Sequence, residues 1–230
     1  GGAVYNGANG EFTLTSGTIS ENSAIDCGAG IYNEGKTQIS GGTIKANSVS
    51  SASGYAGAVY NAGTFTLSAG ASILSHEVAG AGGGVYNDSV GTFTFSSGSI
   101  GSADSPNKAE NGGGVYNKGT VVLTGGEIRA NTASVSGGGV YNAGTMTVSN
   151  GKIEYNDAVN GGGIANIGES AEILIQVCTV EYNSATYGGG VYSEGGSLEL
   201  SSEDTSFGFG VIHQNTARSY GGGVYLKSGT

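Results

Sequence analysis

One motif recurs from one end of the chain to the other at intervals of 24 to 33 residues. Small residues, mostly glycine, lead into an apolar residue that is followed by Tyr and Asn, as in GGGVYN at 112–117. The apolar residue of each copy is Val4, Ile31, Val59, Val85, Val115, Val140, Ile164, Val191 and Val224. Self-similarity at a period of 20–50 residues is typical of solenoids, propellers and arrays. We therefore expect a single repeat segment over residues 1–230.

The sixth copy of the motif shows the plan of one repeat. Residues 140–142, 145–149 and 152–156 are short stretches with alternating or β-branched character, and each ends in Asn or is followed by Asn. Alternation over a few positions predicts half-buried strands, and Gly and Asn are expected to supply corners with positive φ. Three strands and three corners per repeat predict an all-β fold, a parallel β-helix of three short strands per coil and about eight coils. Parallel strands joined by crossovers strongly favour the right-handed form.

Alternation also predicts which side chains point into the solenoid. The inward pairs of the middle strand are Phe12/Leu14, Phe65/Leu67, Phe93/Phe95, Val121/Leu123, Met146/Val148, Ile173/Ile175 and Leu198/Leu200. The Tyr of the motif is expected outside. One column of Asn follows this Tyr and a second closes the third strand, where His76 takes the place of Asn in the third repeat. Stacked amides should hydrogen-bond along both columns, because buried amides need partners.

The amino-acid composition limits the classes of partner that the chain is expected to bind. The net charge of −10 disfavours nucleic acid and anionic membranes, and no apolar run is long enough to span a bilayer. Cys27 and Cys178 should lie about 29 Å apart along the solenoid axis, too far for a disulfide. The chain starts and stops inside the motif. We therefore expect a piece excised from a longer protein, with uncapped ends that would permit end-to-end self-association.

The repeat reads Gly-Gly-Gly-Val-Tyr-Asn-x-Gly-Thr-φ-Thr-φ-Ser-x-Gly-x-Ile-x-x-Asn, where φ is apolar. It resembles the repeats of right-handed parallel β-helix surface proteins, including adhesin-like proteins of gut Firmicutes and methanogens. It is also similar to the repeats of chlamydial polymorphic outer-membrane proteins, which pair Gly-Gly-Ala-Ile with Phe-x-x-Asn. The resemblance implies a non-catalytic stalk or passenger segment of an extracellular, cell-surface protein. Such a segment would mediate or display attachment to a host or environmental glycan or to a surface protein. The resemblance supplies no catalytic residues and no cofactor.

Pectate-lyase-like enzymes share this architecture, so a polysaccharide-active enzyme is the first alternative. Such enzymes need clustered carboxylates and basic residues, whereas the aspartates here are scattered. Glu154 and Glu181 do share a column on neighbouring coils, but Arg129 precedes them in it. We interpret the column as a solvated charge ladder and expect neither catalysis nor a metal site.

The column of outward tyrosines is the most distinctive predicted surface. Aromatic rings with polar tips suit sugar stacking and protein contact, although stacked rings also simply stabilise neighbouring strands. The candidate binding residues of this column are Tyr60, Tyr86, Tyr116, Tyr141 and Tyr192. An insertion in the eighth repeat adds Phe207 and Phe209, either as a second contact or as a plug over the coil.

A second alternative is ice binding by a flat threonine face. Thr-x-Thr occurs at 64–66, 92–94 and 145–147, but other residues occupy the outward positions in the remaining repeats. Threonine is also common on strand surfaces in general.

Overall fold

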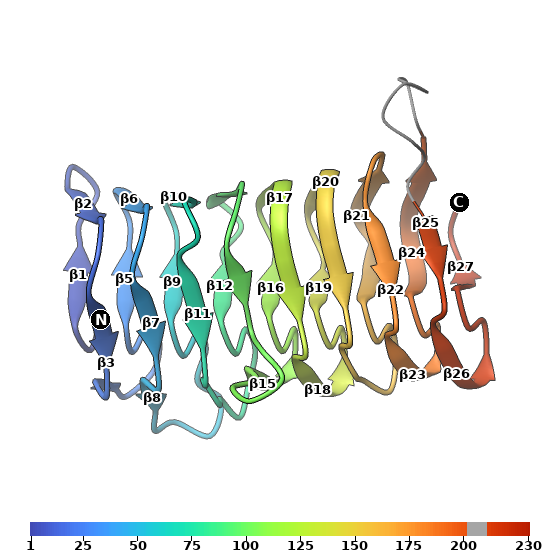
Figure 1. The fold of residues 1–230 in the computed structure, drawn as a ribbon, viewed down its shortest axis with the longest axis horizontal. Helices are drawn as coiled ribbons and strands as arrows, with labels where there is room; N and C mark the ends of the chain where they lie inside the picture. Colours follow the sequence, from blue (N-terminus) through green and yellow to red (C-terminus); the bar gives the residue numbers. More distant parts are fainter. Residues whose placement is uncertain (202–210) are drawn as a thin grey trace.

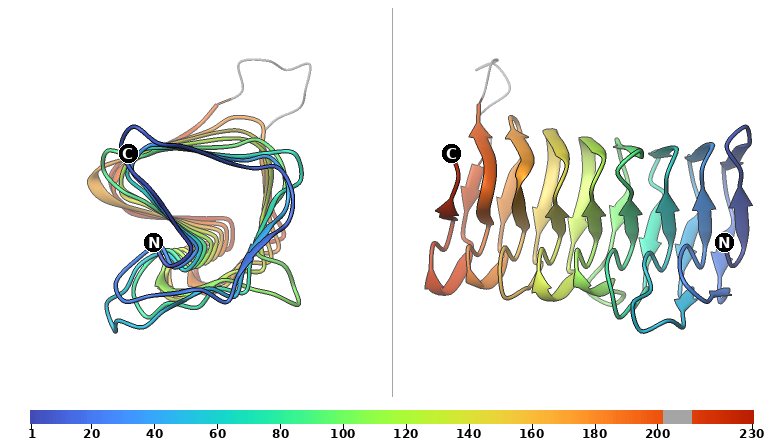
Figure 2. Two further views of the ribbon diagram at one scale, coloured as in Figure 1. Left: turned by 90° about the vertical axis from the view of Figure 1, so that its left-hand side faces the viewer. Right: turned by 180° about the vertical axis from the view of Figure 1, so that it is seen from behind.

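The computed structural model describes residues 1–201 and 211–230 as a right-handed parallel β-helix with no helix in these ranges (Figure 1). Viewed from the N-terminal end, the chain runs clockwise as it recedes, which is the right-handed sense (Figure 2). This confirms the predicted fold class. Each coil begins with the repeated motif, and its strands pair in parallel with the equivalent strands of the coils before and after it.

The strands that carry the motif are called anchor strands here. They are β1 (Val4–Asn6), β5 (Ile31–Asn33), β9 (Val59–Asn61), β12 (Val85–Asn87), β16 (Val115–Asn117), β19 (Val140–Asn142), β21 (Ile164–Ile175), β24 (Val191–Leu200) and β27 (Val224–Ser228). Successive anchor strands are in register, so that Tyr32 pairs with Tyr5 on one side and Tyr60 on the other.

The second and third sides of each coil follow the predicted plan. The middle strands are β2 (Glu11–Leu14), β6 (Lys36–Ile39), β10 (Thr64–Leu67), β13 (Thr92–Phe95), β17 (Thr120–Arg129) and β20 (Thr145–Glu154). The third strands are β3 (Thr18–Ser20), β7 (Thr43–Lys45), β11 (Ser72–Leu74), β14 (Ser99–Ile100), β22 (Thr179–Glu181) and β25 (Val211–His213). β17 and β20 run through the corner from the middle side to the third side, and β21 and β24 join an anchor strand to a middle strand.

Several coils carry a fourth short strand that the sequence pattern did not predict. These strands are β4 (Ser23–Ala24), β8 (Ser48–Val49), β15 (Lys108–Asn111), β18 (Thr132–Ser136), β23 (Ser184–Tyr187) and β26 (Thr216–Tyr220), and they form separate two-stranded ladders. The backbone path is consequently not a plain triangle, because it bends inward between the fourth side and the anchor strands (Figure 2). We call this inward bend of the backbone the notch.

The glycine run of the motif forms the corner at the bottom of this notch. Gly112 has a φ of +66°, a conformation that residues with a Cβ adopt only at a cost. A Cβ added at Gly114 would lie 2.7 Å from the carbonyl oxygen of Gly139 in the next coil. Glycine therefore allows the chain to turn sharply while consecutive coils remain in close contact.

The interior consists of the predicted columns of apolar side chains. The Phe65 and Phe93 rings stack with their centroids 4.8 Å apart, and both side chains are fully buried. In the second coil Thr37 stands in this column, fully buried, and its hydroxyl donates to Asn33 Oδ1 at 2.8 Å. Leu200 pairs with the buried Ile175, in its predicted inward column, but it is 56 % exposed. Among the described strands, none pairs with residues 198–200 on the C-terminal side.

Both predicted asparagine ladders are present. The first runs from Asn6 through Asn33, Asn61, Asn87, Asn117 and Asn142 to Asn166, with Nδ2 to Oδ1 distances of 2.7–2.8 Å. The second runs through Asn22, Asn47, His76, Asn107, Asn131, Asn156, Asn183 and Asn215.

The expectation that asparagine supplies positive-φ corners is wrong, because the residue before each of several second-ladder Asn residues does so. Ala130, Tyr155 and Tyr182 have φ values of 53°, 56° and 53°. This turn points the backbone N–H of Asn156 at Asn183 Oδ1, 2.9 Å away. Each such bond satisfies a buried donor and so offsets the cost of the left-handed conformation.

Candidate functional site

The motif tyrosines form a continuous ladder of stacked rings along the first six coils. The residues are Tyr5, Tyr32, Tyr60, Tyr86, Tyr116 and Tyr141, with successive ring centroids 5.4, 4.8, 5.4, 5.0 and 4.6 Å apart. The planes of neighbouring rings differ by only 4–19°. Such spacing is typical of offset-stacked aromatic pairs. We call this set, with its continuation at Tyr192 and Tyr225, the tyrosine ladder.

The predicted exposed stripe is wrong for two of its members. Tyr86 is only 5 % exposed and Tyr192 only 4 %, while Tyr60, Tyr116 and Tyr141 are half-buried. The fourth side of the coil is the reason, because it lies opposite the ladder across the notch. The ring of Tyr55, from that side, lies 4.9 Å from the ring of Tyr86.

Charged side chains line the polar edge of the ladder. Three hydroxyls donate to carboxylates: Tyr5 to Glu34 at 2.7 Å, Tyr60 to Asp88 at 2.7 Å and Tyr192 to Glu194 at 2.6 Å. Lys118 Nζ lies 5.8 and 5.9 Å from the ring centroids of Tyr86 and Tyr116. Burial, followed by the hydrogen bond to Asp88, raises the pKa of Tyr60 far above its usual value. These phenols therefore stay protonated and act as hydrogen-bond donors.

Ala165 interrupts the ladder. It pairs with Tyr141 on one side and Tyr192 on the other, and it is fully buried. On the C-terminal side of this gap, the structure has a cavity of about 420 Å³. Its lining consists of Asn160, Tyr187, Tyr192, Glu194, Tyr220, Tyr225 and Lys227. The sequence pattern did not indicate Tyr187 and Tyr220 because both belong to the unpredicted fourth side.

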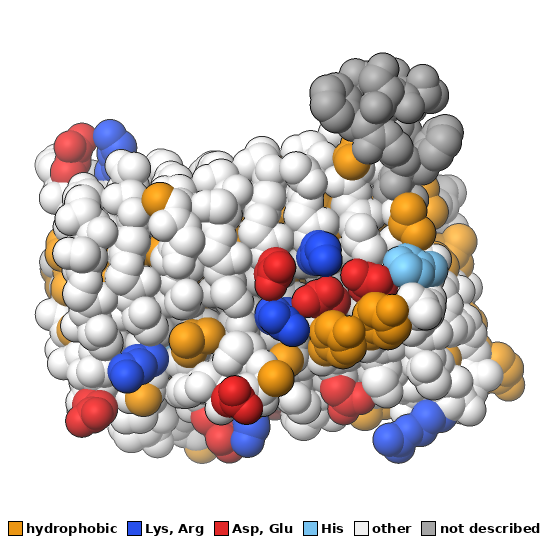
Figure 3. Space-filling model, in the orientation of Figure 1, with side chains coloured by type: hydrophobic (Ala, Val, Ile, Leu, Met, Phe, Trp, Pro, Cys, Tyr) orange, Lys and Arg blue, Asp and Glu red, His pale blue; other side chains and the backbone are white. Residues whose placement is uncertain are grey.

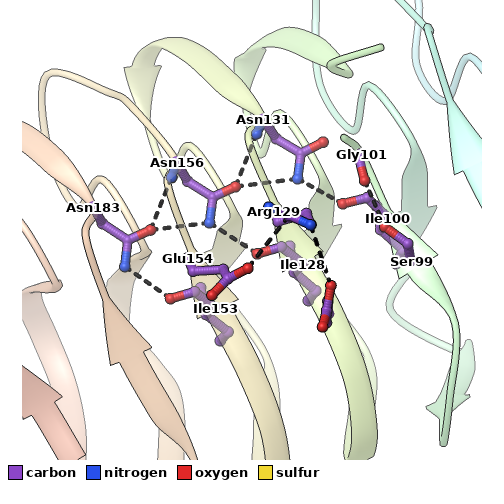
Figure 4. Close-up of polar contacts among 11 residues, drawn as sticks. Ser99, Ile100, Gly101, Ile128, Arg129, Asn131, Ile153, Glu154, Asn156 and Asn183 are labelled. Atoms are coloured by element: carbon purple, nitrogen blue, oxygen red, sulfur yellow. Dashed lines mark hydrogen bonds and ion pairs between the residues drawn. The ribbon is translucent and has the colours of Figure 1, made fainter. Parts of the chain in front are cut away.

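A second polar cluster lies on the opposite side of the coil, on the outer face of the third strands. Arg129, Glu154, Glu181 and His213 are successive rungs, and their charged groups gather on the face seen in Figure 3. Arg129 Nε lies 3.3 Å from Glu154 Oε1, and His213 Nε2 lies 3.0 Å from Glu181 Oε2. Figure 4 shows the Arg129–Glu154 pair beside the second asparagine ladder.

This charge ladder is less solvated than we expected. The side chains of Arg129 and His213 are 35 % and 41 % exposed, but those of Glu154 and Glu181 are only 9 % and 12 % exposed. Burial raises the pKa of Glu154, and the neighbouring Arg129 guanidinium opposes that rise. Both carboxylates are thus held by cationic or protonatable neighbours.

The threonine face is aligned but interrupted. Thr66 pairs with Thr94, and the positions on either side of this pair are Gln38 and Val122.

Phe207 and Phe209 lie outside the described residues. Within residues 1–201 and 211–230, no group of three or more His, Cys, Asp or Glu side chains is placed to hold a metal ion. The same part of the chain contains no helix long and apolar enough to cross a membrane.

Comparison with known proteins identifies no relative: no family model, no curated protein and no solved structure matches this chain.

Proposed function

We propose that this chain is a non-catalytic attachment segment of an extracellular cell-surface protein, and that the tyrosine ladder is its contact surface. The observation that supports the proposal is the ladder itself. It presents half-buried rings at regular spacing, with carboxylates and Lys118 at their edge. Because the ring faces are stacked on one another, the ring edges and hydroxyls, with the charged groups beside them, are the parts that would contact a sugar or a protein surface.

The solenoid suits such a display. Its anchor strands are stacked in register, so the ladder positions repeat at one strand spacing, about 4.8 Å, over roughly 38 Å of axis. A repeated ligand could therefore contact several equivalent positions at once. Many weak contacts along one rigid element then add to a firm attachment. The resemblance of the repeat to adhesin-like surface proteins is the further support for an extracellular location.

The test removes the phenol hydroxyls and keeps the stacked rings. The triple variant Tyr60→Phe, Tyr116→Phe and Tyr141→Phe should retain the β-type circular dichroism spectrum and lose most of the attachment to a glycan array or to immobilised matrix proteins. The matched control is the double variant Tyr155→Phe and Tyr182→Phe, because these two rings also stack, at 5.0 Å, but on another face. Unchanged attachment by the triple variant would rule out the ladder as the contact surface.

One observation favours a polysaccharide-active enzyme as the second candidate. Burial raises the pKa of Glu154 beside a second carboxylate, Glu181, and glycosidases use such a pairing of acid and carboxylate. Against this, Arg129 and His213 already occupy both carboxylates. A screen of neutral and acidic polysaccharides for new reducing ends or unsaturated products decides between the two. Turnover that disappears in Glu154→Gln or Glu181→Gln would replace the attachment proposal.

A further inference from the structure

We infer that the cavity beyond the gap at Ala165 is a binding subsite for one neutral pyranose residue of a glycan. The inference rests on the proposed attachment function and extends it to a defined site and ligand class. The site contains a cluster of tyrosines that belong to two different sides of the coil. Tyr192 and Tyr225 come from the anchor strands and Tyr187 and Tyr220 from the fourth side, and the Tyr225 ring contacts the rings of Tyr187 and Tyr220.

The fourth side carries large aromatic residues at few of its positions facing the notch. At this position each residue pairs with its equivalent in the next coil, and the residues in order are Cys27, Tyr55, Ala81, Asn111, Ser136, Asn160, Tyr187 and Tyr220. Tyr55 packs against Tyr86, and that part of the notch is closed by the contact. At the other end a cavity of about 420 Å³ remains, although four rings surround it. A volume in this range accommodates a sugar residue, since small-molecule sites start at about 300 Å³.

The geometry of the rings suits the apolar face of a pyranose. The rings of Tyr187, Tyr220 and Tyr225 pack against one another, with centroids 5.8–6.0 Å apart, so a ligand would contact the free faces and edges of this cluster. Tyr220 is 62 % exposed, so at least one of these rings is accessible to a ligand. The C–H face of a sugar packs on such rings while its hydroxyls point to the rim.

The rim of the cavity contains both hydrogen-bond acceptors and hydrogen-bond donors, and the neighbouring hydroxyl groups of a sugar need both. Glu194 Oε2 accepts a hydrogen bond from the Tyr192 hydroxyl, and Glu194 Oε1 accepts one from Lys227 Nζ, both at 2.6 Å. The carboxylate retains lone pairs for a sugar hydroxyl, and the ammonium group retains donors. Asn160 adds an amide to the same lining.

The charges at the rim favour neutral sugars over anionic ones. Lys227 and Glu194 neutralise each other, so the rim has no spare positive charge for a phosphate, a sulfate or a uronic acid. An anionic ligand would also approach the Glu194 carboxylate and be repelled by it. The site therefore fits a neutral hexose or N-acetylhexosamine.

The test uses methyl glycosides as probes: the methyl pyranosides of glucose, galactose, mannose and N-acetylglucosamine. Saturation-transfer NMR on the intact chain should detect binding of at least one of them, with the strongest transfer to ring C–H protons, and titration gives the dissociation constant. Tyr220→Ala and Glu194→Gln should each weaken binding by tenfold or more. Tyr220→Phe, which keeps the ring, should stay within about threefold of the parent chain. Tyr182→Ala is the matched control, because Tyr182 is an exposed tyrosine on another face, and it should bind like the parent.

Two results would overturn the inference: no methyl glycoside binds, or Tyr220→Ala and Glu194→Gln both bind like the parent chain. The outcome for the proposed function is separate. If the triple ladder variant loses attachment on the array while Tyr220→Ala and Glu194→Gln retain it, the ladder is the contact surface, and the methyl glycoside titration judges the subsite. If the parent chain attaches to no glycan or matrix protein, the attachment proposal is wrong, and the methyl glycoside titration alone judges the subsite.

Discussion

His76 makes the second asparagine ladder sensitive to acid. Its side chain is fully buried, with Nδ1 3.0 Å from Asn107 Oδ1 and Nε2 3.3 Å from Asn47 Nδ2. A neutral ring that carries its hydrogen on Nδ1 satisfies both contacts, since it donates to Asn107 and accepts from Asn47. A proton added at Nε2 would face the Asn47 amide hydrogens and place a charge in the interior.

The magnitude follows from the shift in pKa. Burial lowers the pKa of His76 from its usual 6.5 to about 4. The folded pKa lies below the unfolded one, so the stability from the neutral ring is present above pH 6.5 and is lost as the pH falls towards 4. At about 1.4 kcal/mol per pKa unit, the full loss is about 3 kcal/mol, and about 2.5 kcal/mol of it has occurred at pH 4.5.

The assay compares the parent chain with His76→Asn, which places at this rung the amide found along the rest of the ladder. Urea unfolding, followed by circular dichroism at pH 7.5 and pH 4.5, gives the stability lost on acidification for each chain. The parent should lose about 2.5 kcal/mol more than His76→Asn, because carboxylate titration affects both equally. His213→Asn is the control, since the side chain of His213 is 41 % exposed and lies outside the ladder. Equal losses in the parent and His76→Asn would refute the reasoning.

Two further predictions concern the interior. Asn156→Ala should lower the free energy of unfolding by about 3 kcal/mol, because the Asn131 N–H and the Ile128 carbonyl lose their partners in a buried setting. Asn150→Ala, at an exposed corner, should cost less than about 0.5 kcal/mol in the same urea titration, and equal costs would contradict the ladder's role. Burial raises the pKa of the Cys178 thiol to about 12, so iodoacetamide at pH 8 should label the more accessible Cys27 first. Mass spectrometry with and without urea checks this, and equal labelling rates in the folded chain would show that Cys178 is not shielded.

The coil plan could be predicted from the sequence alone because it depends on local periodicity repeated many times. Alternation in stretches such as 145–149 assigns the inward columns, and in-register stacking follows when every repeat has the same pattern. The two asparagine ladders follow for the same reason, since equivalent residues of a parallel solenoid lie directly above one another. Even the place of His76 in the second asparagine ladder could be predicted from its position in the repeat.

Only the tertiary structure decided what the outward residues face. The sharp corner at the glycine run and the course of the fourth side create the notch, and both depend on contacts between coils that no local pattern encodes. As a result Tyr86 is buried beneath Tyr55. On the opposite side of the coil, Glu154 is only 9 % exposed beside Arg129, where a solvated ladder was expected. The same folding back brings Tyr187 and Tyr220 opposite Tyr192 and Tyr225. The sequence period identifies residues that stack along the axis, whereas contacts across the notch arise from the shape of the coil.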